Sequence, residues 1–276
     1  MRRSTLLAVL VVLLAGACAP TVVTIVEDDR SPAAGDAALA VAGLQPVEVA
    51  TATLRSAAGC TLRYEVHTPV GSGADLTVVI AHGFLRDLST MRGWAEHLAG
   101  HGLRSAVVSL CRSTPFAGRH AGNAEDLRAV ADALLASEPG RTTGSVAYAG
   151  FSAGGLSALL AAADDPRAVA YLGLDPVDGG GLAARAAGWD GPALFLFAEP
   201  SRCNADGSMV PIVNRLPAAT AIAVPHATHC HFEDPYAPLC ERLCGRVEPE
   251  EAARAIRDAV RSQATAFLLA QAGTRP

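Results

Sequence analysis

The segment Gly150-Phe151-Ser152-Ala153-Gly154 joins two different patterns in this chain of 276 residues. Before its serine, Ser145–Phe151 is mostly apolar, as expected of a strand buried on both faces, and after it Ala153–Ala163 has the composition of a buried helix. The motif G-x-S-x-G at such a junction is typical of a tight strand-to-helix turn, because small neighbours avoid clashes in its strained backbone. A glycine-rich turn without a chemical role would have the same sequence pattern, but the strand–turn–helix context favours Ser152 as a nucleophile.

Apolar runs of strand length recur on both sides of this motif. They are Leu76–Ala81, Leu103–Leu110, Ala168–Leu174, Ala193–Phe197 and Ala219–Val224, and two partly alternating segments, Val47–Leu54 and Leu62–Val70, precede them as a predicted hairpin. Helical patterns separate the runs, and a last helix is predicted from Pro249 to Leu269. Another helix is predicted over Ala124–Leu135 with Asn123 as its N-cap. Continuous apolar strands alternating with helices predict an α/β fold with a doubly wound, mostly parallel sheet, helices on both faces and no large cap domain.

The N-terminus has the pattern of an export signal. Arg2 and Arg3 precede the apolar run Leu6–Leu14, and Ala15-Gly16-Ala17 then provides the small residues of a cleavage site. These small residues before Cys18 resemble a bacterial lipobox, in which that cysteine carries the lipid. An ordinary Ala-x-Ala cleavage would cut the same bond without lipidation.

We therefore predict a signal peptide over residues 1–17, a tether over 18–45 and one catalytic domain over 46–276. The expected location is the cell envelope, where a lipid anchor at Cys18 would hold the protein on the periplasmic or extracellular face. Contact with the membrane is expected only through that anchor.

Six further cysteines follow, which is an even number in a chain predicted to be exported, so up to three disulfides are expected. The sequence leaves their pairing open, and buried unpaired cysteines are the alternative. Because Cys203, Cys230, Cys240 and Cys244 crowd the C-terminal third, we expect at least one bridge among them.

The composition excludes several chemistries. Lysine is absent, since all 22 basic residues are arginine, so the chain has no Schiff-base lysine and no phosphate-loop lysine. The formal charge of −5, without basic clusters, also argues against a nucleic-acid partner.

A second motif, His82-Gly83-Phe84, ends the apolar run Leu76–Ala81. Where a serine attacks a carbonyl, backbone N–H groups after such a strand and after the nucleophile can stabilise the oxyanion. This assigns the amides of Phe84 and Ala153 to an oxyanion hole.

The general base is expected to be a histidine after the last strand, where His226, His229 and His231 occur. We favour His229, because it lies four residues past Pro225, at a distance from which a short loop can return it to Ser152. His226 and His231 stay open as alternatives. A metal site formed by these histidines and Glu233 is the other interpretation, but no zinc-binding spacing supports it.

Several carboxylates could be the acid that orients the base. Asp175 follows the run Ala168–Leu174, at a strand tip where a carboxylate can hold an imidazole. Glu199 and Asp206, after the next strand, are the alternatives.

Three stretches together resemble the chlorophyllase-like branch of the α/β-hydrolases. They are His82-Gly83-Phe84-Leu85, Gly150-Phe151-Ser152-Ala153-Gly154-Gly155 and Gly173-Leu174-Asp175-Pro176-Val177-Asp178, and the resemblance covers residues 76–235. It implies an α/β-hydrolase fold, ester hydrolysis, and a triad of Ser152, Asp175 and His229.

We therefore expect a serine esterase that works through an acyl-enzyme, with no cofactor and no metal. An open site lined by Phe84, Leu85, Phe151, Pro176 and Val177 favours a small-molecule or lipid-like ester with an apolar group. The protein is expected to act as a monomer. One alternative is a peptidase or acyltransferase with the same triad. Another is a non-catalytic or metal-binding surface lipoprotein.

Overall fold

The computed structural model describes residues 34–43, 45–57, 59–71, 75–113, 119–137, 144–236, 238–244 and 249–273. The predicted signal peptide, the lipidation site Cys18 and the first part of the predicted tether lie outside these ranges. No helix within the ranges combines the length and the apolar character needed to cross a membrane.

One eight-stranded sheet organises the chain, with the strand order β1-β2-β4-β3-β5-β6-β7-β8. Strand β2 runs antiparallel to its neighbours β1 and β4, and every other neighbouring pair is parallel. The prediction of an α/β fold with a mostly parallel sheet is confirmed. The strands are β1 (Val47–Arg55), β2 (Thr61–Pro69), β3 (Leu76–Ala81), β4 (Arg104–Ser109), β5 (Ser145–Phe151), β6 (Ala168–Leu174), β7 (Ala193–Phe197) and β8 (Ala219–Ala223).

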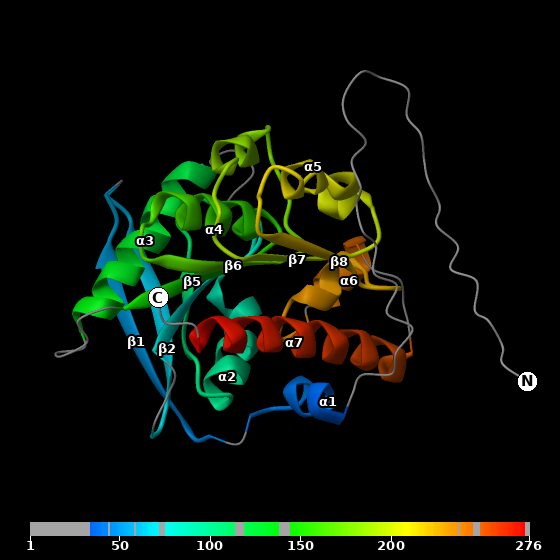
Figure 1. Ribbon diagram of the computed structural model, residues 1–276, viewed down its shortest axis with the longest axis horizontal. Coiled ribbons are helices and arrows are strands. Elements are labelled where there is room, and N and C mark those ends of the chain that lie inside the picture. The colour runs from blue at the N-terminus through cyan, green and yellow to red at the C-terminus, as the bar shows by residue number, and fades with distance from the viewer. Residues whose placement is uncertain are drawn as a thin grey trace, which may run out of the picture.

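Helices cover both faces of this sheet. Figure 1 shows α3 (His120–Ala136) and α4 (Ala153–Asp164) above it, and α2 (Arg92–Gly100) and α7 (Glu250–Ala272) below. The central strands are largely apolar because alternate residues face two cores: in β3, Val79 packs toward α3 and α4, whereas Ile80 packs toward α2 and α7. The carboxyl ends of the parallel strands then share one edge, where the loops discussed below lie.

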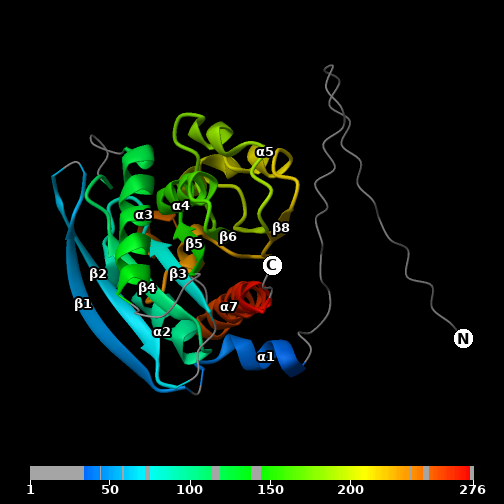
Figure 2. The ribbon, with the colours of Figure 1, turned by 60° about the vertical axis from the view of Figure 1, so that its left-hand side comes forward.

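A short helix, α1 (Ala34–Ala40), lies inside the segment predicted to be a tether. It packs against α7, as both views show (Figures 1 and 2). The following residues are also fixed, since the Gln45 amide donates to the Gly100 carbonyl at 3.1 Å and a ring nitrogen (Nε2) of His101 lies 3.0 Å from the Val41 carbonyl oxygen. Residues 34–43 therefore belong to the folded unit. An alanine-rich turn this short has no period of its own and depends on tertiary packing for its stability.

The expected N-cap of α3 is also wrong. The helix begins at His120, one turn before the predicted start, and Asn123 is buried inside it. The Asn123 side chain donates to the Arg112 carbonyl at 3.0 Å, whereas an N-cap side chain would accept from a helix amide. A contact with the preceding loop thus replaces the local capping bond.

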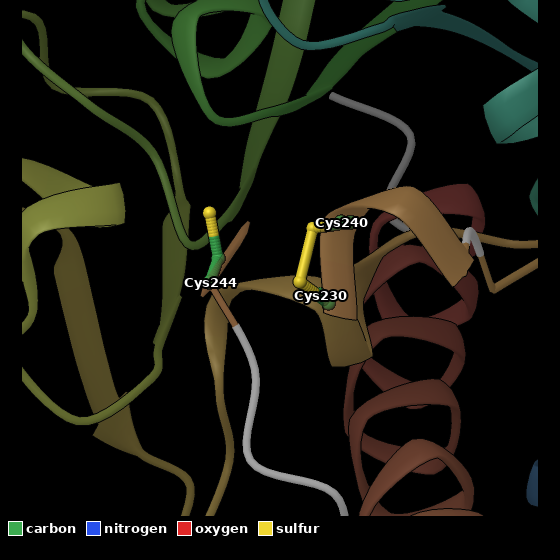
Figure 3. Close-up of side chains that lie close together, drawn as sticks. All are labelled: Cys230, Cys240 and Cys244. Atoms are coloured by element: carbon green, nitrogen blue, oxygen red, sulfur yellow. A yellow bond between two sulfur atoms is a disulfide. The ribbon is translucent and has the colours of Figure 1, made fainter. Parts of the chain in front are cut away.

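Three disulfides are present: Cys60–Cys111, Cys203–Cys244 and Cys230–Cys240. They confirm the prediction of up to three bridges and of at least one in the C-terminal third. Such bridges form and persist in oxidising compartments, as an exported protein would meet. Two of them end on the short helix α6 (Pro238–Cys244), and Figure 3 shows Cys244 beside the Cys230–Cys240 bridge.

The buried histidine His97 makes stability depend on pH. Its Nε2 atom lies 2.9 Å from the Thr265 hydroxyl, which links α2 to α7. Burial, assisted by His101 and Arg261, lowers the pKa of His97 from 6.5 to about 4. Between these pH values the unfolded chain binds a proton that the native chain does not, so the free energy of unfolding falls as pH falls.

We therefore predict that His97→Gln reduces the acid sensitivity of the fold. Urea unfolding at pH 7.5 and pH 5.0 should show a loss of stability in the wild type that is larger by about 2 kcal/mol than in the variant. An equal loss in both proteins would contradict this role.

Candidate active site

Ser152 occupies a strained turn between β5 and α4. Its backbone has φ 54° and ψ −126°, a conformation that L-residues adopt rarely. The turn is held on both sides, because the Ser152 amide donates to the Leu174 carbonyl at 3.1 Å and the Ser152 carbonyl accepts from Gly155 and Val177 at 2.9 and 3.0 Å. The serine side chain is thereby directed outward at the carboxyl end of a central strand.

Glycine is required around this turn because the backbones approach one another closely. A Cβ atom at Gly150 would lie inside 3.0 Å of the Gly154 carbonyl, and one at Gly154 would meet the His82 carbonyl at similarly short range. A Cβ at Gly83 would lie 3.2 Å from the Ser152 Cβ. The main chain of residues 82–84 therefore lies directly against the main chain of residues 152–154.

The structure brings Ser152, His229 and Asp175 into one hydrogen-bonded line. The His229 Nε2 atom is 3.0 Å from the Ser152 hydroxyl oxygen, and the His229 Nδ1 atom is 2.6 Å from an Asp175 carboxylate oxygen. Asp175 follows β6, the neighbour of β5, and His229 begins the helical turn η4 (His229–Phe232) after β8. All three residues are buried, with exposed fractions of 7% for Ser152, 6% for His229 and 0% for Asp175.

The order of these contacts shows which ring nitrogen of His229 carries the hydrogen. A carboxylate only accepts hydrogen bonds, so Nδ1 of His229 carries the hydrogen and Nε2 is left to accept from the Ser152 hydroxyl. The Phe151 ring lies beneath the imidazole, with ring centres 4.6 Å apart and planes tilted by 36°. The arrangement can therefore withdraw a proton from Ser152 while Asp175 stabilises the imidazolium that forms.

Asn204 holds the acid and was not predicted from the sequence. Its side-chain amide donates to both Asp175 carboxylate oxygens, at 3.3 and 3.2 Å, and to the Glu199 carbonyl at 3.0 Å. The Ala198 amide donates to the same carboxylate at 3.0 Å. Asn204 is itself fixed, because its Oδ1 atom accepts from the Ser201 amide at 2.8 Å. No motif marks this asparagine, and its place next to Cys203 is the only signal in the sequence.

The alternative acids lie elsewhere. The Glu199 side chain is half exposed and has a carboxylate oxygen 3.8 Å from Nδ1 of His226, not near His229. Asp206 is exposed in a left-handed turn at φ 52°. Of the three predicted candidates, Asp175 is the one that contacts His229.

The other late histidines face different partners. The His226 side chain is 80% exposed, and Nδ1 of His231 accepts from the Thr228 amide at 2.9 Å. Glu233 bonds to Arg86 at 2.6 Å. Among the described residues, potential metal ligands converge in two clusters, and both consist mainly of disulfide-bonded cysteines. One is Cys230, Cys240 and Cys244, and the other is Cys60 and Cys111 with Asp126. The three histidines and Glu233, predicted as an alternative metal site, thus do not bring their ligand atoms together at one point.

His82 fixes the loop expected to provide the oxyanion hole. Its Nε2 atom accepts from the Leu110 amide at 2.9 Å, so its Nδ1–H donates to the Gly83 carbonyl at 2.8 Å. Burial lowers the pKa of His82, which keeps the ring neutral in this role. Ala153 begins α4, and amides in the first turn of a helix have no partner within the helix. The two amides predicted for the oxyanion hole, those of Phe84 and Ala153, therefore belong to segments that meet at Ser152.

The predicted pocket lining is only partly exposed. Leu85 is 60% and Phe84 37% exposed beside the nucleophile, and Val177 is half-buried. Phe151 and Pro176 are buried, however, because Phe151 supports the His229 ring and Pro176 packs against Gly155 and Gly173. These two residues support the turn, and contact with a ligand is expected from the oxyanion loop and Val177.

A surface hollow of about 460 Å³ lies at the opposite ends of the strands, between α3 and the turn from α4 to β6. Charged side chains of both signs line it. Arg167 pairs with Asp165 at 2.9 Å and with Asp132 at 2.7 Å. Four carboxylates and two guanidinium groups line it, and Arg167 is held by two of the carboxylates, so we interpret this hollow as part of a structural ion-pair network.

No protein-family model matches the chain, and no curated protein matches its sequence. The chemistry assigned to the site therefore rests on the geometry of its residues.

We predict that Asn204→Ala slows the reaction of Ser152 with a serine-directed phosphonate by about tenfold or more, because a hydrogen bond to a charged group contributes about 1.5–3 kcal/mol. The rate of labelling, followed by intact-protein mass, measures this. Asn214→Ala, at an exposed position of the same region, is the matched control and should react like the wild type. Equal rates for both variants would exclude a role for Asn204 in holding the acid.

We also predict that the Cys230–Cys240 bridge maintains the position of His229, its neighbour in η4. The double variant Cys230→Ser with Cys240→Ser should lose a few kcal/mol of stability, since removing a native disulfide typically costs about 2–5 kcal/mol. Phosphonate labelling of the fraction that remains folded should be slower than in the wild type. Unchanged labelling would show that the loop needs no such anchor.

Proposed function

We propose that this protein is a serine hydrolase that cleaves carboxylic esters through an acyl-enzyme. The observation that carries the proposal is the continuous line from Ser152 through His229 to Asp175, with contacts of 3.0 and 2.6 Å, on a strained strand-to-helix turn. A buried aspartate, a histidine and a serine in this geometry form the catalytic unit of many hydrolases on unrelated folds.

The fold supports the same proposal at a finer level. A serine on a sharp turn after a central parallel strand, followed in the chain by an aspartate and then a histidine, is the arrangement of the α/β-hydrolases. Together with the HGF, GxSxGG and LDPV stretches, it favours the chlorophyllase-like branch of that fold. The acid after β6, at Asp175, agrees with the position that this resemblance implies.

In the first half of the reaction, His229 takes the proton of Ser152 as its oxygen attacks the ester carbonyl. The resulting oxyanion is stabilised by the amides of Phe84 and Ala153, and a single donor of this kind contributes about 3–4 kcal/mol in a protease that uses the same device. His229 then gives its proton to the leaving alcohol, and the acyl group stays on Ser152.

In the second half, His229 takes a proton from water, which attacks the acyl-enzyme carbonyl. The tetrahedral intermediate collapses, the acid leaves, and Ser152 recovers its proton from His229. Asp175 keeps the imidazole in one orientation throughout, because Asn204 and the Ala198 amide fix its carboxylate.

The exposed side chains at the site indicate an apolar substrate group. Phe84 and Leu85 present apolar surface on the loop that faces Ser152, so an acyl or alcohol group of low polarity would gain burial there. We propose a small-molecule or lipid-like ester, without a cofactor. The three disulfides support action in an oxidising compartment, and we propose that a lipid on Cys18 holds the domain at the cell envelope.

The proposal predicts that Ser152→Ala lowers kcat for p-nitrophenyl butyrate by about a thousandfold or more, while the fold survives. Ser157→Ala, which changes another buried serine on α4, is the matched control and should retain activity. Hydrolysis by the Ser152 variant at the wild-type rate would exclude this mechanism. Parallel assays with p-nitroanilide and thioester substrates separate an esterase from a peptidase or an acyltransferase with the same triad.

A further inference from the structure

One ion pair joins the two loops that flank the nucleophile. The Nε atom of Arg86 donates to the Oε1 atom of Glu233 at 2.6 Å, although the residues are 147 positions apart in the chain. Arg86 directly follows the exposed Phe84 and Leu85 of the oxyanion loop, which we define as residues 82–86. Glu233 directly follows η4, the helical turn that begins with His229. The pair therefore connects the loop of the oxyanion hole to the loop of the base.

This pair is buried at a considerable energetic cost. The Glu233 side chain is 0% exposed and that of Arg86 is 16% exposed. The second carboxylate oxygen of Glu233, Oε2, is buried without a hydrogen-bond partner among the described residues. Because an apolar pair of similar volume is often at least as stable as a buried ion pair, stability alone does not account for this arrangement.

Arg86 also contacts the strained part of its own loop. Its Nη1 atom lies 3.5 Å from the Leu85 carbonyl oxygen, and Leu85 has a left-handed backbone with φ 55°. The Leu85 amide donates to the Ser113 carbonyl at 2.9 Å from the other side. The guanidinium of Arg86 thus lies between Glu233 and the residue that follows Phe84.

The loop of the base has other anchors that do not need Glu233. The Trp94 indole donates to the Phe232 carbonyl at 2.9 Å, and the Asp234 amide donates to the Thr90 carbonyl at 2.9 Å. Arg261 of α7 pairs with the Asp234 side chain at 2.6 Å. The Glu233 side chain is therefore free to serve the oxyanion loop, and its replacement should leave this part of the fold in place.

We propose that Glu233 is a positioning residue that holds the oxyanion loop against Ser152 through Arg86. This inference rests on the proposed esterase function. It explains why a charged pair occupies a buried position between two catalytic loops.

Charge at Glu233 is balanced by the groups that face it. Burial raises the pKa of Glu233, whereas Arg86 and a protonated His229 lower it. Asp175 contacts Nδ1 of His229, and the neighbouring Asp234 pairs with Arg261. The guanidinium of Arg86 is therefore the charge in direct hydrogen-bond contact with Glu233.

The first test removes the link while preserving packing. In the double variant Arg86→Met with Glu233→Leu, an apolar pair replaces the ion pair, so Tm should equal or exceed that of the wild type. We expect kcat for p-nitrophenyl butyrate to fall about 10- to 100-fold with KM little changed, as a small misplacement of a catalytic group does. Wild-type kcat in this variant would overturn the proposal.

The second test isolates the hydrogen bond. Glu233→Gln keeps an acceptor for Arg86 but no negative charge, so it should retain part of the link that Glu233→Leu removes. We expect kcat of Glu233→Gln to lie between those of the wild type and Glu233→Leu with KM little changed, a partial rescue that loss of packing alone would not cause. A kcat as low as that of Glu233→Leu would overturn the role of this hydrogen bond.

Glu65→Gln is the matched control, because Glu65 is a buried carboxylate in an ion pair with Arg92 at 2.6 and 2.7 Å, on the distant strand β2. It should lower stability while kcat stays unchanged. Arg86→Met alone removes the link from its more exposed side, and it replaces the double variant if that protein does not fold. If Ser152→Ala is inactive but the variants that remove the Arg86–Glu233 pair keep the wild-type kcat, only this inference is rejected. If Ser152→Ala is active, the proposed function itself is rejected.

Discussion

The left-handed backbone of Ser152 is the constraint on which the site depends. A residue held in such a conformation costs about 1–3 kcal/mol and persists only when its surroundings determine it fully. Here the Ser152 amide donates a hydrogen bond to the Leu174 carbonyl, and the close backbone approaches at Gly150 and Gly154 hold the turn in this conformation. The turn directs the hydroxyl toward His229, so the acid, the base and the oxyanion loop are all placed relative to one strained residue.

Three disulfides link the loops around this residue to neighbouring turns and to the short helix α6. Cys111 lies two residues before Ser113, whose carbonyl accepts from the oxyanion loop. Cys203 lies beside Asn204, and Cys230 beside His229. Each bridge therefore attaches next to a residue that holds or forms part of the triad or the oxyanion loop. Loops at the carboxyl edge of a parallel sheet have few backbone partners of their own, and covalent links reduce their freedom.

The sequence was sufficient to predict the strands and to single out the three residues that the structure brings into one hydrogen-bonded line. All eight strands lie within one residue of their predicted ends. The buried strands β3–β7 are largely apolar, and the hairpin strands β1 and β2 partly alternate, so both kinds leave a pattern in the sequence. Ser152, Asp175 and His229 were found from short motifs and their order in the chain. Asn204 and Glu233 could not be assigned their contacts, since each acts on a residue far away in the sequence through a side-chain contact that no local period encodes. Helix α1 escaped prediction for the same reason, because its stability comes from packing against α7.

The central claim is that Ser152 forms a covalent acyl-enzyme. The most direct measurement is the mass of the protein after rapid acid quenching of its reaction with p-nitrophenyl butyrate, followed by peptide mapping. We expect a single butyryl group on the peptide that contains Ser152, formed together with an initial burst of about one equivalent of p-nitrophenol per protein. Turnover with no adduct, or an adduct on any other residue, would contradict the account.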